Sequence, residues 1–188
     1  REREQRIAEA AALLGLEETG VPDVNFSSGG AMGDGKCLRD WAYYSALIEG
    51  VQISDLAIEP GSDKLIVVGR GFDEATPTYA IAVQRMTSLC DRDAGFANSA
   101  GQLLYAFSDS SIPHEAHGVA LVPTLVSGVV VASKIVVAGA VYETSSSSFD
   151  FGVLRLNPNG TSDSSFGGSG LGYRRIPWDM GDTSHDLG

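Results

Sequence analysis

Short segments in which apolar and polar residues alternate recur along the chain, and they predict β-strands. In the segment 79–85 large apolar residues alternate with small or polar ones, so the apolar side chains share one face of a strand. The segment 149–153 repeats that pattern. The residues of this face are Tyr79, Ile81 and Val83 in the first segment and Phe149, Phe151 and Val153 in the second.

Each of these segments has further predicted strands around it. Segments 55–59 and 64–68 are joined by Pro-Gly-Ser-Asp, a turn composition that predicts a hairpin. Segment 102–107 is predicted as a fourth strand, and segment 171–176 is its counterpart. Four short antiparallel strands in each unit are typical of a β-propeller blade.

The units repeat at a constant distance. Asp23, Asp93 and Asp163 are each followed three residues later by Phe, and 93 − 23 = 163 − 93 = 70. The same offset relates five further pairs, which are Lys64 and Lys134, Gly69 and Gly139, Tyr79 and Phe149, Val83 and Val153, and Arg85 and Arg155. The second copy has TLVSGVVVASK where the first has GSDK, so 11 − 4 = 7 extra residues are expected in that hairpin. Length variation in loops between regular strands is typical of a repeat fold.

The repeat predicts an all-β chain with about two and a half four-stranded antiparallel blades. We expect an N-terminal helix or partial strand at 1–22 and the end of a preceding blade with an aromatic loop at 23–52. Two blade repeats follow at 53–110 and 111–178, and 179–188 begins a third. Because propellers close with about four to eight blades, we expect the partners to include further blades of a longer chain or copies of this one.

The composition narrows the classes of partner. There are 13 Lys and Arg residues against 24 Asp and Glu residues, so the net charge is −11 and the sequence pI is about 4.5. An acidic chain has no basic surface with which to neutralise phosphates, so we exclude nucleic acid and anionic membranes as partners. No apolar run approaches the roughly 20 residues of a spanning helix. We therefore expect no membrane-spanning segment.

The two cysteines, Cys37 and Cys90, are too few for a disulfide scaffold and too far apart for a CxxC site. They could form one bridge in an oxidising compartment or remain two buried thiols. The spacing leaves both alternatives open.

The segment FGVLRLNPNGTSDSSFGGSG, residues 151–170, resembles the bacterial delta-sixty repeat, a β-propeller repeat of surface and exported proteins. The matching positions in this segment are Arg155, Asn157, Gly160, Asp163, Phe166, Gly167 and Gly170. A second part of the family pattern matches Lys64, Leu65, Val67 and Gly69, and again Lys134, Ile135, Val137 and Gly139. The resemblance implies a propeller scaffold on a secreted or cell-surface protein, and it implies no catalytic residue. Earlier copies depart from the pattern, with Cys90, Ala97 and Ala100 in place of glycines.

The repeated charged residues have a structural and a functional interpretation. Asp93 and Asp163 could be metal carboxylates, but an Asp that recurs before every turn is better explained as a turn former. Phe26, Phe96 and Phe166 are then expected to be buried at equivalent places, as are Val83 and Val153. For Arg85 and Arg155 an ion pair with Asp93 or Asp163 is favoured over contact with a ligand.

No cofactor or metal site is expected. The stretch 157–163 faintly resembles a calcium loop but offers one acid where Ca²⁺ prefers several, so calcium stays the weaker alternative. His114 and His117 are spaced by three with no third ligand apparent. We expect them to face solvent or to bond to a turn.

The candidate binding residues are three aromatics in the segment 38–50, which departs most from the repeat. They are Trp41, Tyr43 and Tyr44. Exposed aromatic side chains suit contact with a carbohydrate or a protein, although packing over a blade edge explains them equally well.

The chain contains neither a G-x-S-x-G motif nor a phosphate-binding loop. We therefore expect a non-enzymatic, extracellular or cell-surface propeller segment that acts as a structural or binding scaffold. The alternative is a carbohydrate-binding or glycan-hydrolysing propeller with its site on the blade face.

Overall fold

The structure is a computed structural model, and it describes residues 48–73, 77–107, 113–144 and 147–177. The predictions for the N-terminal helix or strand, for Asp23 and Phe26, and for the start of a third blade lie outside these residues. Cys37, Trp41, Tyr43 and Tyr44 lie outside them as well.

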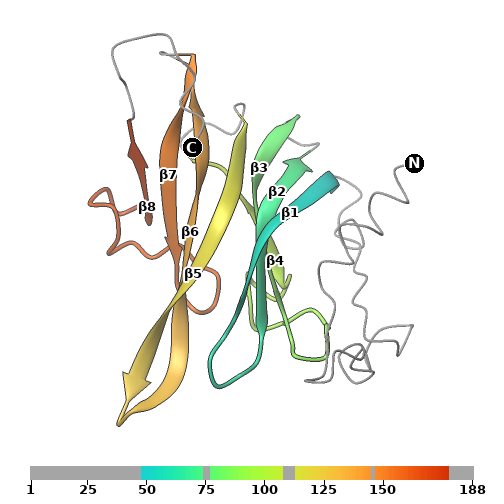
Figure 1. Ribbon diagram of the computed structural model, residues 1–188, viewed down its shortest axis with the longest axis vertical. Coiled ribbons are helices and arrows are strands. Elements are labelled where there is room, and N and C mark those ends of the chain that lie inside the picture. The colour runs from blue at the N-terminus through green and yellow to red at the C-terminus, as the bar shows by residue number, and fades with distance from the viewer. Residues whose placement is uncertain (1–47, 74–76, 108–112, 145–146, 178–188) are drawn as a thin grey trace, which may run out of the picture.

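The described residues form two antiparallel four-stranded sheets that lie side by side (Figure 1). The first sheet has the order β1(Ile48–Ile58), β2(Leu65–Asp73), β3(Thr78–Met86), β4(Gln102–Tyr105). The second has the order β5(His114–Val126), β6(Val129–Glu143), β7(Ser148–Leu156), β8(Tyr173–Ile176). Within the described residues all regular elements are strands, which confirms the predicted all-β fold class and the four-stranded antiparallel units.

The registers of the two sheets place the predicted residues on the predicted faces. Tyr79 lies opposite Phe72 of β2, and the equivalent Phe149 lies opposite Tyr142 of β6. Both pairs of rings meet edge to face, with centroids 5.3 and 5.2 Å apart. The two sheets therefore use the same face for the same side chains.

The repeated glycines of β2 and β6 are explained by a bulge in the neighbouring strand. β1 is irregular between Ile53 and Asp55, and β5 is irregular between Ala116 and Gly118. A Cβ on Gly69 would lie 1.8 Å from the Gln52 carbonyl oxygen, and one on Gly139 would lie 1.9 Å from that of Glu115. Because no side chain fits at such distances, each bulge requires glycine opposite it.

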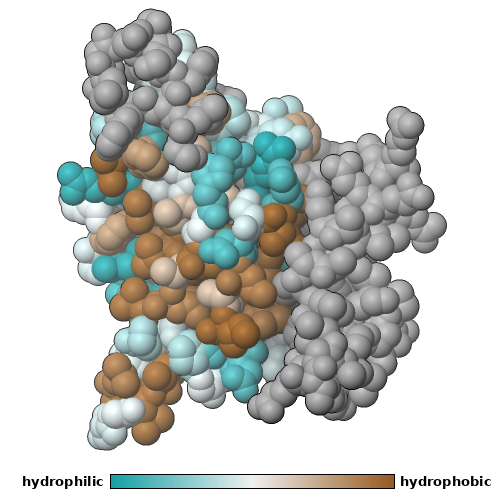
Figure 2. All heavy atoms as spheres, viewed as in Figure 1, coloured by the Kyte–Doolittle hydropathy of each residue, from teal (hydrophilic) through white to brown (hydrophobic). Residues whose placement is uncertain are grey.

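The extra residues of the second copy lengthen the β5–β6 hairpin, as predicted. Its two-residue loop is Ser127 and Gly128, with φ of 51° and 82°, the left-handed pair of a type I′ turn. The tip exposes Leu125, Val126 and Val129, and Figure 2 shows it projecting from the body of the molecule with a hydrophobic surface.

The core lies between the sheets. Side chains of β2 and β3 pack against side chains of β6 and β7, with Phe96 and Phe107 between them. Its fully buried members include Ile66, Val68, Ile81 and Val83 from the first sheet and Ile135, Val137, Leu154 and Leu156 from the second.

Two details of the predicted repeat are wrong. Phe166 and Val153 are only half-buried, although Phe96 and Val83 are fully buried, because the core between the sheets uses this face of the first sheet but not of the second. The last strand of the second sheet begins at Tyr173 rather than Leu171, since the loop after Phe166 is one residue longer than the loop after Phe96. The Arg85 amide bonds to Gly101, 71 residues before Gly172, the acceptor for the Arg155 amide.

Candidate functional site

Asp93 organises the loop that follows β3. Its carboxylate accepts hydrogen bonds from Arg85 Nε at 2.6 Å and from the Gly95 amide at 2.9 Å, and Lys64 Nζ lies 2.8 Å away. The Phe96 amide donates to the Asp93 carbonyl at 3.1 Å, which closes the turn before the buried ring. One acidic side chain thus ties β2, β3 and the loop together.

Asp163 makes the same contacts in the second sheet. It accepts from Arg155 Nε at 2.7 Å, from Lys134 Nζ, and from both the amide and the hydroxyl of Ser165 at 3.1 and 2.7 Å. The predicted Arg–Asp ion pairs are confirmed in both sheets. Lys64 and Lys134 as the third members were missed, although their spacing of 70 residues was the signal.

The surroundings favour the charged form of both carboxyls. Burial alone would raise the pKa of Asp93, but the hydrogen bonds from Lys64 and Gly95 and the charges of Arg85 and Lys64 outweigh it, so the pKa lies below its ordinary value. The Lys134 and Ser165 hydrogen bonds lower the pKa of Asp163 strongly, and Arg155 contributes in the same direction. Both acids are therefore anions that accept hydrogen bonds at neutral pH.

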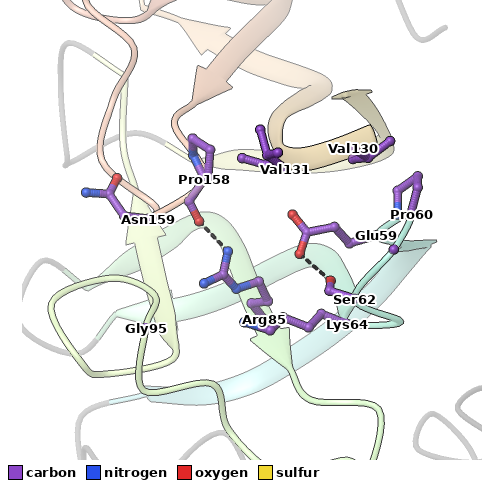
Figure 3. A pocket seen from close by; sticks show the side chains of 12 residues that line it. Glu59, Pro60, Ser62, Lys64, Arg85, Gly95, Val130, Val131, Pro158 and Asn159 are labelled. Atoms are coloured by element: carbon purple, nitrogen blue, oxygen red, sulfur yellow. Dashed lines mark hydrogen bonds between the residues drawn. The ribbon is translucent and has the colours of Figure 1, made fainter. Parts of the chain in front are cut away.

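A turn of the second sheet docks onto the first sheet beside Asp93. Arg85 Nη1 donates to the Pro158 carbonyl, as Figure 3 shows, and the Ala97 amide donates to the Asn159 carbonyl at 2.8 Å. The Arg85 guanidinium also lies over the Phe96 ring, 5.0 Å from its centroid. A Cβ on Gly160 would lie 2.7 Å from this ring, so glycine lets the turn approach.

A hollow of about 310 Å³ opens at the same junction (Figure 3). Its polar lining includes Glu59, Lys64 and Arg85, and its apolar lining includes Pro60, Val131 and Pro158. Glu59 is 7% exposed and accepts a hydrogen bond from the Ser62 hydroxyl at 2.8 Å. The hollow thus presents donors and acceptors together, a lining that suits a small polar ligand.

The histidine prediction is wrong for one of the two residues. His117 is exposed, and its Nε2 lies 3.3 Å from Glu115 Oε1. His114 is 1% exposed and packs edge to face on Phe107, because position 114 of β5 faces the core while position 117 lies at the bulge. The described residues contain no group of three or more His, Cys, Asp or Glu side chains that could hold a metal.

The oxygens of the predicted calcium-like stretch serve the turn itself. Asn159 Oδ1 accepts from the amide and the hydroxyl of Thr161 at 3.1 and 2.7 Å. Asp163 already has Lys134 and Arg155 on one carboxylate oxygen. Two cations at the only acid of the stretch oppose the binding of Ca²⁺.

Cys90 is buried and disulfide-bonded. It stands where the second copy has Gly160 and shares the positive φ of that turn position, 65° against 85°. The candidate binding residues Trp41, Tyr43 and Tyr44 remain predictions. Among the described residues no helix is long and apolar enough to cross a membrane.

Comparison with known families identifies one segment. Residues 133–166, which run from β6 through β7 to Phe166, match the family model "Domain of unknown function (DUF5122) beta-propeller". Searches of curated proteins and of solved structures found no match. The segment contains Lys134, Arg155, Asp163 and Gly160, so the match covers the Asp163 cluster and the docking turn. The chain is thus similar to a β-propeller repeat family, and its two sheets have the four-stranded antiparallel order of propeller blades.

Proposed function

We propose that this chain is a non-enzymatic segment of a secreted or cell-surface β-propeller and acts as a structural or binding scaffold. The observation that carries the proposal is the use of the repeated charged residues. In both blades the Asp, Arg and Lys side chains bond to one another and to the backbone of their own loop, and Arg85 also bonds to the neighbouring blade. Side chains with such bonds hold the blade together and are not free to act on a substrate.

Two observations support export. Cys90 is disulfide-bonded, and disulfides persist in oxidising compartments. The segment 151–170 also resembles repeats of bacterial surface and exported proteins. Alkylation of the native protein with and without reduction, read by mass spectrometry, is expected to label Cys90 only after reduction. Labelling of Cys90 without reduction would count against an oxidising compartment.

Further blades are the proposed partners of the scaffold. The described residues form two blades, whereas a propeller ring needs about four to eight. The outer face of the second blade supports this, since Phe151 and Ile176 on it are 41% and 43% exposed. Blades of a longer chain or of other copies could both supply the cover.

The scaffold proposal is tested by a screen of the full chain against glycosidase, esterase and peptidase substrates, together with a glycan array. We expect no turnover, and we expect any glycan binding to be lost in Trp41→Ala and Tyr43→Ala. Turnover that survives purification and disappears in Glu59→Gln would overturn the proposal. Arg174→Gln is the matched control, because this exposed charge lies outside the hollow.

A glycan-binding propeller is the second candidate, and the hollow at the blade junction favours it. Glu59 and Arg85 there supply an acceptor and a donor that suit sugar hydroxyls. Glycoside hydrolysis generally needs two carboxyl groups about 5 to 9.5 Å apart. Glu59 is the only acidic residue in the lining, so the hollow suits binding better than hydrolysis.

A further inference from the structure

The second blade contains a copy of the surface that receives the docking turn on the first blade. On the first blade, the Arg85 guanidinium lies 5.0 Å from the Phe96 ring centroid. On the second, the Arg155 guanidinium lies 4.7 Å from the Phe166 ring centroid. Both arginines also donate through Nε to the Asp of their own loop, at 2.6 and 2.7 Å. The two arginine–phenylalanine pairs therefore have the same geometry.

The two copies differ in what contacts them. Arg85 Nη1 donates to the Pro158 carbonyl and the Ala97 amide to the Asn159 carbonyl, and both acceptors belong to the next blade. The hydrogen bonds that Arg155 makes use its Nε and Nη2 atoms, toward Asp163 and Ser165. Among the described residues no carbonyl lies at Arg155 as Pro158 lies at Arg85. The Arg155 side chain is accordingly 26% exposed, against 7% for Arg85.

The backbone beside the ring is also prepared in the same way. Ala97, which donates to the docked turn, has a φ of 51°. Its equivalent, Gly167, has a φ of 84° and belongs to the same left-handed stretch after the ring. The second blade thus repeats the guanidinium, the ring and the amide of the first.

We propose that Arg155, Phe166 and Gly167 form a binding site for an Asn-Pro-Asn-Gly-type turn of another propeller blade. The proposal rests on the scaffold function and deepens it by naming the contact that joins one blade to the next. In this site Arg155 Nη1 donates to the carbonyl of the second turn residue, and the Gly167 amide donates to the carbonyl of the third.

The geometry sets the chemistry of the partner. The turn must present two successive backbone carbonyls, which match the guanidinium and the amide. Its fourth residue must be glycine, because a Cβ on Gly160 would lie 2.7 Å from the Phe96 ring and 2.9 Å from the Ala97 amide nitrogen. A φ of 85° at Gly160 adds to this requirement, since L-residues with a side chain rarely adopt it.

The surroundings of the site indicate a whole blade rather than a loose peptide. The site lies at one end of the outer face of β7, on which Val153 and Phe151 follow Arg155 at alternate positions. On the first blade the same positions, Val83 and Ile81, are fully buried under the second blade. The turn is therefore one contact of a larger apolar interface, and alone it binds weakly.

The test uses the full chain and a head-to-tail cyclic hexapeptide with the sequence of residues 156–161. NMR signals of the arginine Nε–H groups and phenylalanine rings report on both copies of the site at once. We expect a saturable shift of the Arg155 and Phe166 signals with a dissociation constant in the millimolar range. The Arg85 and Phe96 signals should not move, because their site already holds a turn of the same chain.

Two matched controls define the outcome. A peptide with valine in place of the glycine should not bind, and Arg155→Lys, which retains the charge, should weaken binding about tenfold through loss of a charged hydrogen bond. Equal shifts with the glycine and valine peptides, or no saturable shift at about ten times the expected dissociation constant, would overturn the proposal. If Arg155→Lys does not fold, the two peptides on the unaltered chain decide. The substrate screen tests the scaffold function separately and needs no peptide.

Discussion

In the first blade, the face formed by Ile81 and Val83 packs against the second blade, whereas the corresponding face of the second blade has no such cover among the described residues. Ile81 is 0% exposed, and its equivalent Phe151 is 41% exposed. The Asp93 and Asp163 clusters nevertheless have the same contacts in both blades. The hydrogen-bonded loop therefore forms within one repeat, whereas burial depends on the neighbour.

This difference separates two sources of stability in a repeat fold. Each repeat contributes its own strands, turns and ion pairs, and each interface contributes apolar burial. The Arg85–Phe96 pair contributes to both, since it belongs to one blade and receives a turn of the next. The Arg155–Phe166 pair shows the intrinsic part in the absence of the docked turn.

The largest expected contrast is between Phe96→Ala and Phe166→Ala. Phe96 is fully buried at the interface, so its truncation should cost about 4 kcal/mol of unfolding free energy. Phe166 is half-buried, and the same change should cost about 2 kcal/mol. Urea unfolding measures both. Equal losses would show that the neighbouring blade adds nothing to the burial of Phe96.

The bulge glycines should behave alike in the two blades. Gly69→Ala and Gly139→Ala each bring a Cβ within 1.9 Å of a backbone oxygen, so each should cost about 3 kcal/mol. Gly168→Ala is the control, because its Cβ meets no atom within 4 Å and only the positive φ opposes it. A loss no larger than that of the control in either blade would contradict the shared bulge.

The two aspartates should make stability fall in acid. Because their pKa values are lowered in the folded protein, the unfolded chain takes up protons first as the pH falls below the ordinary value of 3.8. Their contribution is complete above about pH 5 and is lost progressively below about pH 4. Asp93→Asn and Asp163→Asn should each flatten this decline in urea unfolding measured against pH. An unchanged pH dependence in both variants would show that the clusters do not stabilise the fold.

The smallest effect is expected at Ala97, where the first blade departs from the glycine of the second. Its φ of 51° is unfavourable for alanine, so Ala97→Gly should stabilise the chain by about 0.5 kcal/mol. Ala100→Gly in the same loop has no positive φ to relieve and should be slightly destabilising. Thermal unfolding of the two variants provides the comparison. A destabilised Ala97→Gly would mean that the strain at this position is absent.

The sequence was sufficient to predict what lies within one repeat. The offset of 70 residues identified equivalent strands, and alternation identified the faces of Tyr79 and Phe149. The ion pairs of Arg85 and Arg155 also followed, because an Asp and an Arg that recur together must lie close in each copy. These features depend on residues near one another in the chain or in register.

Features that depend on the neighbouring blade could not be predicted in this way. Phe96 and Phe166 are identical in sequence context but differ in burial, since the docked turn that covers Phe96 lies more than 60 residues away, at Gly160. The hollow beside Glu59 likewise combines residues of both blades. The burial of His114 follows from the bulge in β5, and no spacing of histidines indicates a bulge.

The central claim is that the two blades are the same unit and that only the cover of one face differs. The most direct test measures the solvent exposure of phenylalanine rings by NMR with a soluble gadolinium chelate. The account predicts strong relaxation enhancement of Phe151, weaker enhancement of Phe166 and none of Phe96. Equal protection of Phe96 and Phe166, together with protection of Phe151, would contradict it.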